Sequence, residues 1–183
     1  MSNAVTPIFR VSYPFVFQAR FNSLSKKEEF SIQALFKKGE DLSLLKKAAQ
    51  EVCEKKWGTD SKKWPKLKTP FRDQEERAKE GTLPDGCEAG AIFMTFKSTT
   101  QPAIRDSSNT TFITEPSKFY AGCFARASVF AMAYDVNGAR GVTFLLNHLQ
   151  FAADGAPFSS RPPIESAFAP IEGSGNGDAT SIF

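Results

Sequence analysis

The pattern of apolar and polar positions changes period several times along the chain. Residues 8–21 alternate between apolar and polar side chains, which predicts a long strand with one buried face. Pro14 interrupts this strand, so we expect an edge position, a bulge or a bend there. The face predicted to be buried comprises Phe9, Val11, Tyr13, Phe15, Phe17, Ala19 and Phe21.

A second strand and a helix follow. Residues 28–37 alternate in the same way, and the turn-like residues 22–25 predict a hairpin between the two strands. Over residues 41–57, apolar side chains recur every three or four positions, which predicts an amphipathic helix. We expect Asp41 to be its N-cap and Gly58 to end it.

The middle of the chain is more polar and less regular. Residues 59–72 predict a basic loop, and residues 73–80 are compatible with a short polar helix. Residues 88–98 predict a further strand. Residues 102–114 predict a short hairpin whose tip lies at 106–109.

The pattern then predicts a long hairpin. Its strands are residues 122–135 and 141–153, joined by the Asn-Gly turn at 137–138. We interpret residues 1–158 as one domain. Residues 159–183 are rich in Gly, Pro, Ser and Ala and poor in large apolar side chains, which predicts a flexible, weakly acidic C-terminal tail.

The order of these elements favours one fold class. Strands without a regular strand–helix alternation predict an α+β fold that is mainly β. The OB-fold, a five-stranded barrel that binds oligonucleotides, is compatible with this order. Its helix usually lies between the third and fourth strands. The early helix over 41–57 therefore predicts a decorated, OB-fold-like barrel.

Composition adds a charge asymmetry. The chain has 183 residues, of which 41% are hydrophobic and 18 are Phe, so it can build a core. The 23 Lys+Arg against 20 Asp+Glu give a net charge of +3. Residues 159–183 contain one Arg and three acidic residues, which leaves the preceding body at +5. A basic body with an acidic tail favours an anionic partner for the body.

Cysteines, histidine and motifs argue against several functions. Cys53, Cys87 and Cys123 have no CxxC spacing, so we expect no disulfide framework, metal site or cofactor. His148 is the single histidine, and no GxSxG or phosphate-binding glycine motif occurs, so we do not expect an enzyme. No apolar run is long enough to span a membrane and no signal peptide is evident, so we expect a cytoplasmic location.

The densest group of cations lies in residues 62–72, which contain no acidic residue. Trp64 and Phe71 are interspersed with these cations. Cations neutralise phosphates, and flat rings stack on unpaired bases, so the segment favours single-stranded nucleic acid. The alternative is a solvated basic loop with Trp64 and Phe71 packed beneath it.

The strand over residues 122–135 has two unlike faces. One face is small and apolar, which suits close packing inside a barrel. The other combines Arg126 with Phe124, Phe130 and Tyr134. This face is either a stacking platform with a cation beside it or a second core layer at a helix or subunit interface.

Three blocks of the sequence carry a family resemblance: 66–73 (KLKTPFRD), 119–127 (FYAGCFARA) and 141–151 (GVTFLLNHLQF), followed by Asp-Gly at 154–155. They resemble a family of bacteriophage single-stranded-DNA-binding proteins, long catalogued as a phage domain of unknown function. The resemblance implies an OB-fold, sequence-independent binding of single-stranded DNA, and a role in phage replication and recombination.

These observations define one hypothesis and its rival. We expect a protein that coats and protects single-stranded DNA, with the rival being a structural or interaction β-barrel such as a virion component. The many aromatic residues favour a homodimer or higher assembly. Ile182 and Phe183 at the acidic end suit docking into replication proteins. The candidate DNA-binding residues are Lys62, Lys63, Trp64, Lys66, Lys68, Phe71, Arg72, Lys97, Arg105, Tyr120, Arg126, Phe130, Tyr134 and Arg140.

Overall fold

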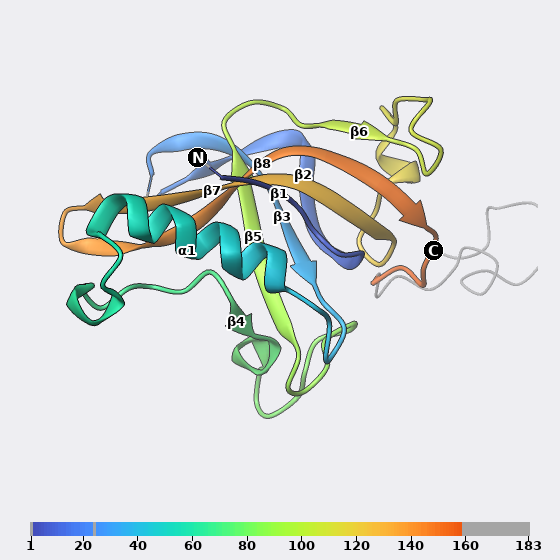
Figure 1. Cartoon of the computed structure of the whole chain (residues 1–183). Helices are drawn as coiled ribbons and strands as arrows, with labels where there is room; N and C mark the ends of the chain where they lie inside the picture. Colours follow the sequence, from blue (N-terminus) through green and yellow to red (C-terminus); the bar gives the residue numbers. More distant parts are fainter. Residues whose placement is uncertain (1, 24, 159–183) are drawn as a thin grey trace, which may run out of the picture.

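A computed structural model describes residues 2–23 and 25–158, and Figure 1 traces the chain. One α-helix, α1 (Ser43–Trp57), lies within this part of the chain, with short 3-10 turns at Ser61–Lys63, Gln74–Arg77 and Pro116–Lys118. The strands in the described part are β1 (Ser2–Val5), β2 (Phe9–Asn22), β3 (Lys27–Leu35), β4 (Arg72–Asp73), β5 (Ile92–Ser98), β6 (Ala103–Arg105), β7 (Phe124–Val136) and β8 (Ala139–Ala153).

Five strands form a ring in the order β2–β3–β5–β8–β7, and β7 pairs with β2 again. All neighbours in the ring are antiparallel except β5 and β8, which are parallel. The β5–β8 and β2–β7 pairings are short, so the ring is partly open at these two places. A five-stranded, partly open barrel is the OB architecture. The prediction of a mainly β, OB-like fold with one helix is confirmed.

Three short strands extend the ring. β1 pairs with β7, β4 pairs with β5, and β6 runs parallel to β8. The sequence analysis missed β1 and β4, because elements of four and two residues leave no measurable periodicity.

Figure 1 shows α1 lying next to β7, and the buried side chains of α1 join the core of the ring. These side chains are Leu45, Ala48, Ala49, Val52 and Cys53.

Aromatic side chains fill the interior of the ring. Phe9 meets Phe36 and Phe96 edge-on, with centroid distances of 5.8 and 6.1 Å, and Phe96 meets Phe144 at 6.3 Å. All four are buried. Because burial of one such ring contributes about 1.5–3 kcal/mol, this cluster is a main source of stability.

The predicted buried face of β2 is correct at Phe9 and Val11 and in part at Phe17, which packs against the core, but it is wrong at Tyr13 and Phe21. The pairing with β3 shifts register between Ser12 and Phe15, and Tyr13 adopts a positive φ of 45°. After this bulge Val16, rather than Phe15, is buried. Tyr13 is consequently exposed, and so is Phe21 near the end of the strand. Pro14 signalled the irregularity, but the sequence left open whether it would be an edge, a bend or a bulge.

The ends of α1 differ slightly from the prediction. Leu42 is the N-cap residue, and Asp41 accepts a hydrogen bond from the Ser43 backbone N–H at 2.9 Å. The capping role of Asp41 is thus displaced by one position. Gly58, with a φ of 88°, ends the helix as expected, since this left-handed conformation favours glycine.

The compatible helix over 73–80 is replaced by the 3-10 turn Gln74–Arg77. Its first residue, Gln74, is buried and donates to the carbonyl oxygens of Phe36 and Ile92 at 2.8 and 2.9 Å. Its Oε1 accepts from the Glu88 backbone N–H at 2.7 Å. These bonds satisfy a buried amide and fix the turn against the ring, which is why no regular polar helix forms.

Both predicted hairpins in the second half are confirmed. Asn137 and Gly138 have positive φ angles of 49° and 79°, as the tight turn between β7 and β8 requires. The second hairpin folds back from Arg105 to Phe112. Its tip is held by Asp106, whose carboxylate accepts from the backbone N–H of Thr110 at 2.8 Å.

Candidate functional site

The basic segment crosses the open side of the ring. We call residues 64–73 the strap. At one end the backbone N–H of Lys68 donates to Arg140 on β8 at 2.8 Å, and the Lys68 carbonyl accepts from Val142 at 3.2 Å. At the other end Arg72 pairs with Phe93 on β5. The strap therefore bridges β8 and β5 where these two strands barely pair.

Apolar side chains fix the strap from beneath. Trp64, Leu67 and Phe71 are half-buried and pack against the core. The Phe71 ring meets Phe144 edge-on at 6.2 Å, and Trp64 Nε1 donates to the Gly58 carbonyl at 2.7 Å. This is the packing that the alternative interpretation of Trp64 and Phe71 requires. Four lysines nevertheless face solvent on or beside the strap: Lys62, Lys63, Lys66 and Lys68.

Gly141 allows the strap to approach β8. A Cβ atom at this position would lie 2.6 Å from the Lys68 carbonyl oxygen and 2.8 Å from the Tyr134 hydroxyl oxygen. The backbone of the strap and the Tyr134 side chain therefore meet over Gly141. This close approach places an exposed lysine beside a half-buried aromatic ring.

The outer face of the β7–β8 hairpin continues from this junction. Ala125, Ala127, Val129 and Ala131 point into the core, so Arg126, Phe130 and Tyr134 lie on the opposite face, as predicted. Phe130 pairs with Leu145, which in turn pairs with Lys97 of β5. The hairpin therefore brings together five of the predicted residues from the strap, β5, β7 and β8: Lys68, Lys97, Phe130, Tyr134 and Arg140. Arg126 lies on the same face but towards the other end of β7.

Several of the cations predicted to bind DNA have carboxylate partners. Arg72 contacts Glu76 at 2.6 Å, and Arg140 contacts Asp135 at 2.8 Å. Lys63 and Lys97 form longer pairs with Asp60 and Glu29 at 3.4 and 3.5 Å. Ion pairs at exposed sites contribute only about 0–1 kcal/mol, so a phosphate can replace the exposed carboxylates of Asp60, Glu76 and Asp135 at low cost.

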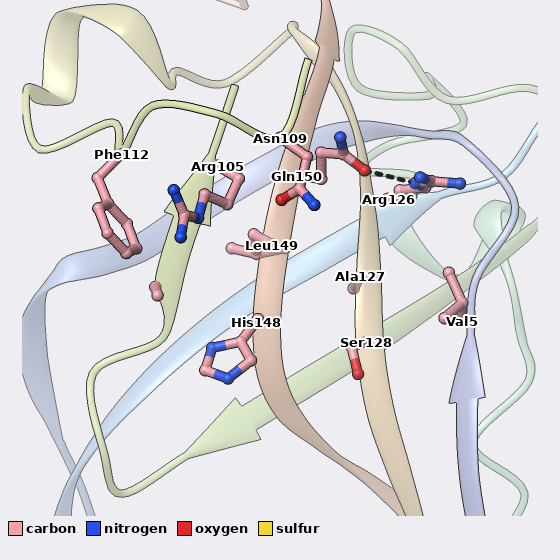
Figure 2. Close-up of a pocket in the computed structure, with 11 residues that line it drawn as sticks. Val5, Arg105, Asn109, Phe112, Arg126, Ala127, Ser128, His148, Leu149 and Gln150 are labelled. Carbon is pink, nitrogen blue, oxygen red and sulfur yellow. Dashed lines mark hydrogen bonds between the residues drawn. The ribbon is translucent and has the colours of Figure 1, made fainter. Parts of the chain in front are cut away.

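Arg105 and Arg126 line a separate cavity of about 590 Å³, which we call the arginine pocket. Figure 2 shows the two side chains on either side of β8. Arg126 Nε donates to Gln150 Oε1 at 2.8 Å. Arg105 lies 3.7 Å from the centre of the Phe112 ring. The complete lining is Val5, Ala103, Arg105, Asn109, Phe112, Arg126, Ala127, Ser128, His148, Leu149 and Gln150.

Tyr120 lies apart from both groups. Its single O–H hydrogen can be donated either to Asp154 Oδ1 at 2.9 Å or to the Gly155 carbonyl oxygen at 3.0 Å, and its ring packs against the core. Burial and the neighbouring carboxylate raise the pKa of Tyr120 above its usual value. The side chain thus ties the end of β8 to the segment before β7, and it presents no free ring face at the strap.

A further cationic and aromatic group was missed by the sequence analysis. The bulge in β2 turns Tyr13 outward, and Arg77 lies between it and Phe93, at 5.4 and 5.6 Å from the two rings. Arg20 lies 3.6 Å from the centre of the Phe15 ring. The available signal was Pro14, which breaks the alternation that assigned Tyr13 and Phe15 to the core.

Groups that could support catalysis are few in the described residues. Burial raises the pKa of the Cys123 thiol to about 11, which disfavours a reactive thiolate. No cluster of His, Cys, Asp and Glu able to hold a metal ion occurs in residues 2–23 and 25–158. In the same ranges no helix is long and apolar enough to cross a membrane. Ile182 and Phe183, predicted to contact a partner, lie outside the described residues.

The partly open ring with a basic strap across one opening defines an OB-like architecture. The chain belongs to the family described as Enterobacter phage Enc34, ssDNA-binding protein, whose model matches residues 2–180. The resemblance seen in the three sequence blocks is thereby confirmed. Among curated proteins, none matches the chain.

The solved structures of similar fold include two phage proteins. One is the single-stranded DNA-binding protein from bacteriophage Enc34 in complex with ssDNA, with 16% identity, a TM-score of 0.66, and coverage of 86% of this chain and 89% of that chain. The other is gp2.5, a single-stranded DNA-binding protein encoded by bacteriophage T7. It has 10% identity and a TM-score of 0.63, with coverage of 96% of this chain and 99% of that chain.

Proposed function

We propose that this protein binds single-stranded DNA without sequence preference and protects it during phage DNA replication. Membership of the Enc34 family supports this proposal, and the fold matches that of two proteins named for the same activity. The observation that carries it is the strap, a segment with exposed lysines whose backbone is fixed across the ring. Exposed cations on a fixed backbone attract a phosphate backbone without distinguishing bases.

We propose that the bound DNA strand runs over the strap and along the outer face of β7–β8. Lys62, Lys63, Lys66 and Lys68 would neutralise phosphates, and Phe130 and Tyr134 would stack on bases. Trp64, Phe71 and Tyr120 would then act as packing supports, because their contacts lie with the core and with neighbouring backbone. The remaining cations of this surface are Arg72, Lys97 and Arg140.

This binding requires only charge and aromatic surface. We therefore propose a non-enzymatic role without a metal or cofactor. DNA binding of this type acts by excluding nucleases and by preventing base pairing, and neither effect needs a chemical step. The protein would work in the host cytoplasm, where phage DNA is replicated.

Removal of the lysine charges on and beside the strap, in what we call the strap variant, tests the proposal. In the variant K62Q/K63Q/K66Q/K68Q, the logarithmic salt dependence of binding to oligo(dT) should fall by about 0.7 for each phosphate that the variant no longer neutralises. The matched control is K46Q/K47Q/K55Q/K56Q, which removes four exposed lysines from α1. Fluorescence anisotropy should show weaker binding for the strap variant only. Equally weakened binding in both variants would mean that net charge, and not the strap, determines affinity.

We also propose a division of labour along the chain. Residues 1–158 would contain the DNA-binding domain, and residues 159–183 would contact replication proteins through Ile182 and Phe183. Deletion of 159–183 should leave the melting temperature unchanged and oligo(dT) affinity unchanged or slightly higher, since acidic competitors are removed. Light scattering of both forms tests the expected homodimer or higher assembly.

A further inference from the structure

The arginine pocket lies well away from the strap. Arg126 lines the pocket, whereas Tyr134 lies at the junction with the strap, and the two are eight positions apart on β7. At about 3.3 Å per residue, this separation is about 26 Å. The pocket is therefore a distinct binding surface at the other end of the same hairpin.

The charge of the pocket is one-sided. Its lining includes two arginines and His148 but no carboxylate side chain among the described residues. The nearest acid on the adjoining hairpin, Asp106, is held by the backbone N–H groups of Thr110 and Thr111 at 2.8 and 3.2 Å. That carboxylate is therefore already engaged in the hairpin tip, and the pocket favours an anion.

The two arginines are arranged around one residue. Arg126 pairs with Gln150 across β7 and β8, and Arg105 pairs with Gln150 across β6 and β8. Two strand spacings separate the arginines by about 10 Å. Only Nε of Arg126 is bonded, to Gln150, and its two Nη groups have no partner among the described residues. Guanidinium groups held in this way bind phosphate through paired hydrogen bonds.

An aromatic shelf and an apolar floor complete the pocket. Phe112 is 56% exposed although it is large and apolar, and Arg105 covers one side of its ring. Ala103, Ala127 and Leu149 line the pocket between the polar groups, although Ala127 and Leu149 belong to the buried core and leave Phe112 as the exposed apolar surface. A flat base stacks on such a surface with little dependence on its identity. The volume of about 590 Å³ lies within the range of small-ligand pockets.

We propose that the arginine pocket binds one nucleotide of a single DNA strand, with its phosphate between Arg105 and Arg126 and its base against Phe112. This inference rests on the proposed function, and it extends the binding surface along the β7–β8 hairpin beyond the strap. A DNA strand long enough to reach both the strap and the arginine pocket would be held at two points. A short DNA strand would occupy the strap alone.

This proposal is tested with oligo(dT) of roughly 4 and 16 nucleotides, which are the smallest and largest binding-site sizes of one OB-fold. In R105Q/R126Q, affinity for the longer strand should fall about fivefold or more, while affinity for the shorter strand stays unchanged. The control K46Q/K47Q removes the same charge from α1. F112A should weaken binding of the longer strand to a similar degree without a change in charge. Because R105Q could disturb the hairpin tip, R126Q alone is measured if the double variant melts at a lower temperature.

Unchanged affinity of R105Q/R126Q and F112A for the longer strand would overturn the pocket proposal. The strap variant tests the proposed function separately, so the two failures are distinguishable.

NMR titration with dTMP identifies the source of the nucleotide. Shifts at Phe112 and His148 with dTMP alone support capture of free or terminal nucleotides, and shifts only with the longer strand support an internal one. Shifts with a polyglutamate peptide but neither nucleotide probe would contradict the proposal.

Discussion

The strap and the arginine pocket both combine cations with aromatic rings, but they hold them differently. In the strap, the backbone is fixed to β5 and β8 and the lysine side chains extend freely into solvent. In the pocket, the guanidinium groups themselves are held: Gln150 accepts from Arg126, and Arg105 lies against Phe112 and donates to the Thr110 carbonyl at 2.9 Å. Lysines act as mobile point charges, whereas fixed guanidinium groups impose geometry. The strap therefore suits retention of a sliding strand, and the pocket suits placement of one nucleotide.

The substitution Gly141→Ala should break the strap and leave the pocket intact, and we expect it to have the broadest effect, on both stability and DNA affinity. A Cβ atom would meet the Lys68 carbonyl oxygen at 2.6 Å, so the strap must move away from β8. Overpacking of this kind costs about 1–3 kcal/mol. Thermal unfolding should show a lower melting temperature, and oligo(dT) affinity should fall. Lys68→Ala is the control, because it removes the charge and keeps the backbone bonds. Normal stability of Gly141→Ala would contradict the close approach.

Phe71→Ala and Phe130→Ala separate packing from stacking. Phe71 lies under the strap against Phe144, so its truncation should lower stability by about 2–3 kcal/mol, below the range for fully buried rings. Phe130 lies on the outer face, so its truncation should weaken oligo(dT) binding by roughly 1–3 kcal/mol with a smaller change in stability. Denaturant unfolding and anisotropy titration measure the two quantities. The reverse result would assign stacking to Phe71.

The rim of the pocket should respond weakly to pH. Hydrogen bonds from Thr110 and Thr111 lower the pKa of Asp106 to about 2 from an ordinary value of 3.8. The depressed pKa means that the carboxylate stabilises the hairpin tip fully above about pH 4. This contribution is lost as the pH falls from 3.8 towards 2. NMR amide shifts of Thr110 and Thr111 should therefore stay constant from about pH 8 to about pH 5. A pH-dependent change in these amide shifts at any pH above about 5 would show that Asp106 is not held as described.

The sequence predicted most of the ring because its strands are long and their inward positions are apolar. Small inward residues identified the two faces of β7, and an Asn-Gly pair identified its turn. β2 was only partly correct, because the bulge between Ser12 and Phe15 exposes Tyr13 and buries Val16 in place of Phe15. A local pattern carries no information about such a register shift until the partner strand is known.

The candidate site was predictable as a set of residue types but not as an arrangement. The cations of 62–72 were visible in the sequence. Their position beside β8 depends on Gly141, which lies far along the chain and lets the Lys68 backbone come close. Arg105 and Arg126 were both predicted to bind DNA. Their meeting around Gln150 depends on parallel pairing of the three-residue β6 with β8, which no sequence pattern indicated.

The central claim is that this protein prefers single-stranded DNA and binds it through phosphate contacts and stacking. Anisotropy titrations of the full chain with oligo(dT) and with a duplex of the same length, repeated over a series of salt concentrations, test it most directly. We expect tighter binding to oligo(dT) than to the duplex. The logarithm of affinity should fall linearly with the logarithm of salt concentration, by about 0.7 per neutralised phosphate. Equal affinity for the duplex, or binding that does not change with salt, would contradict the account.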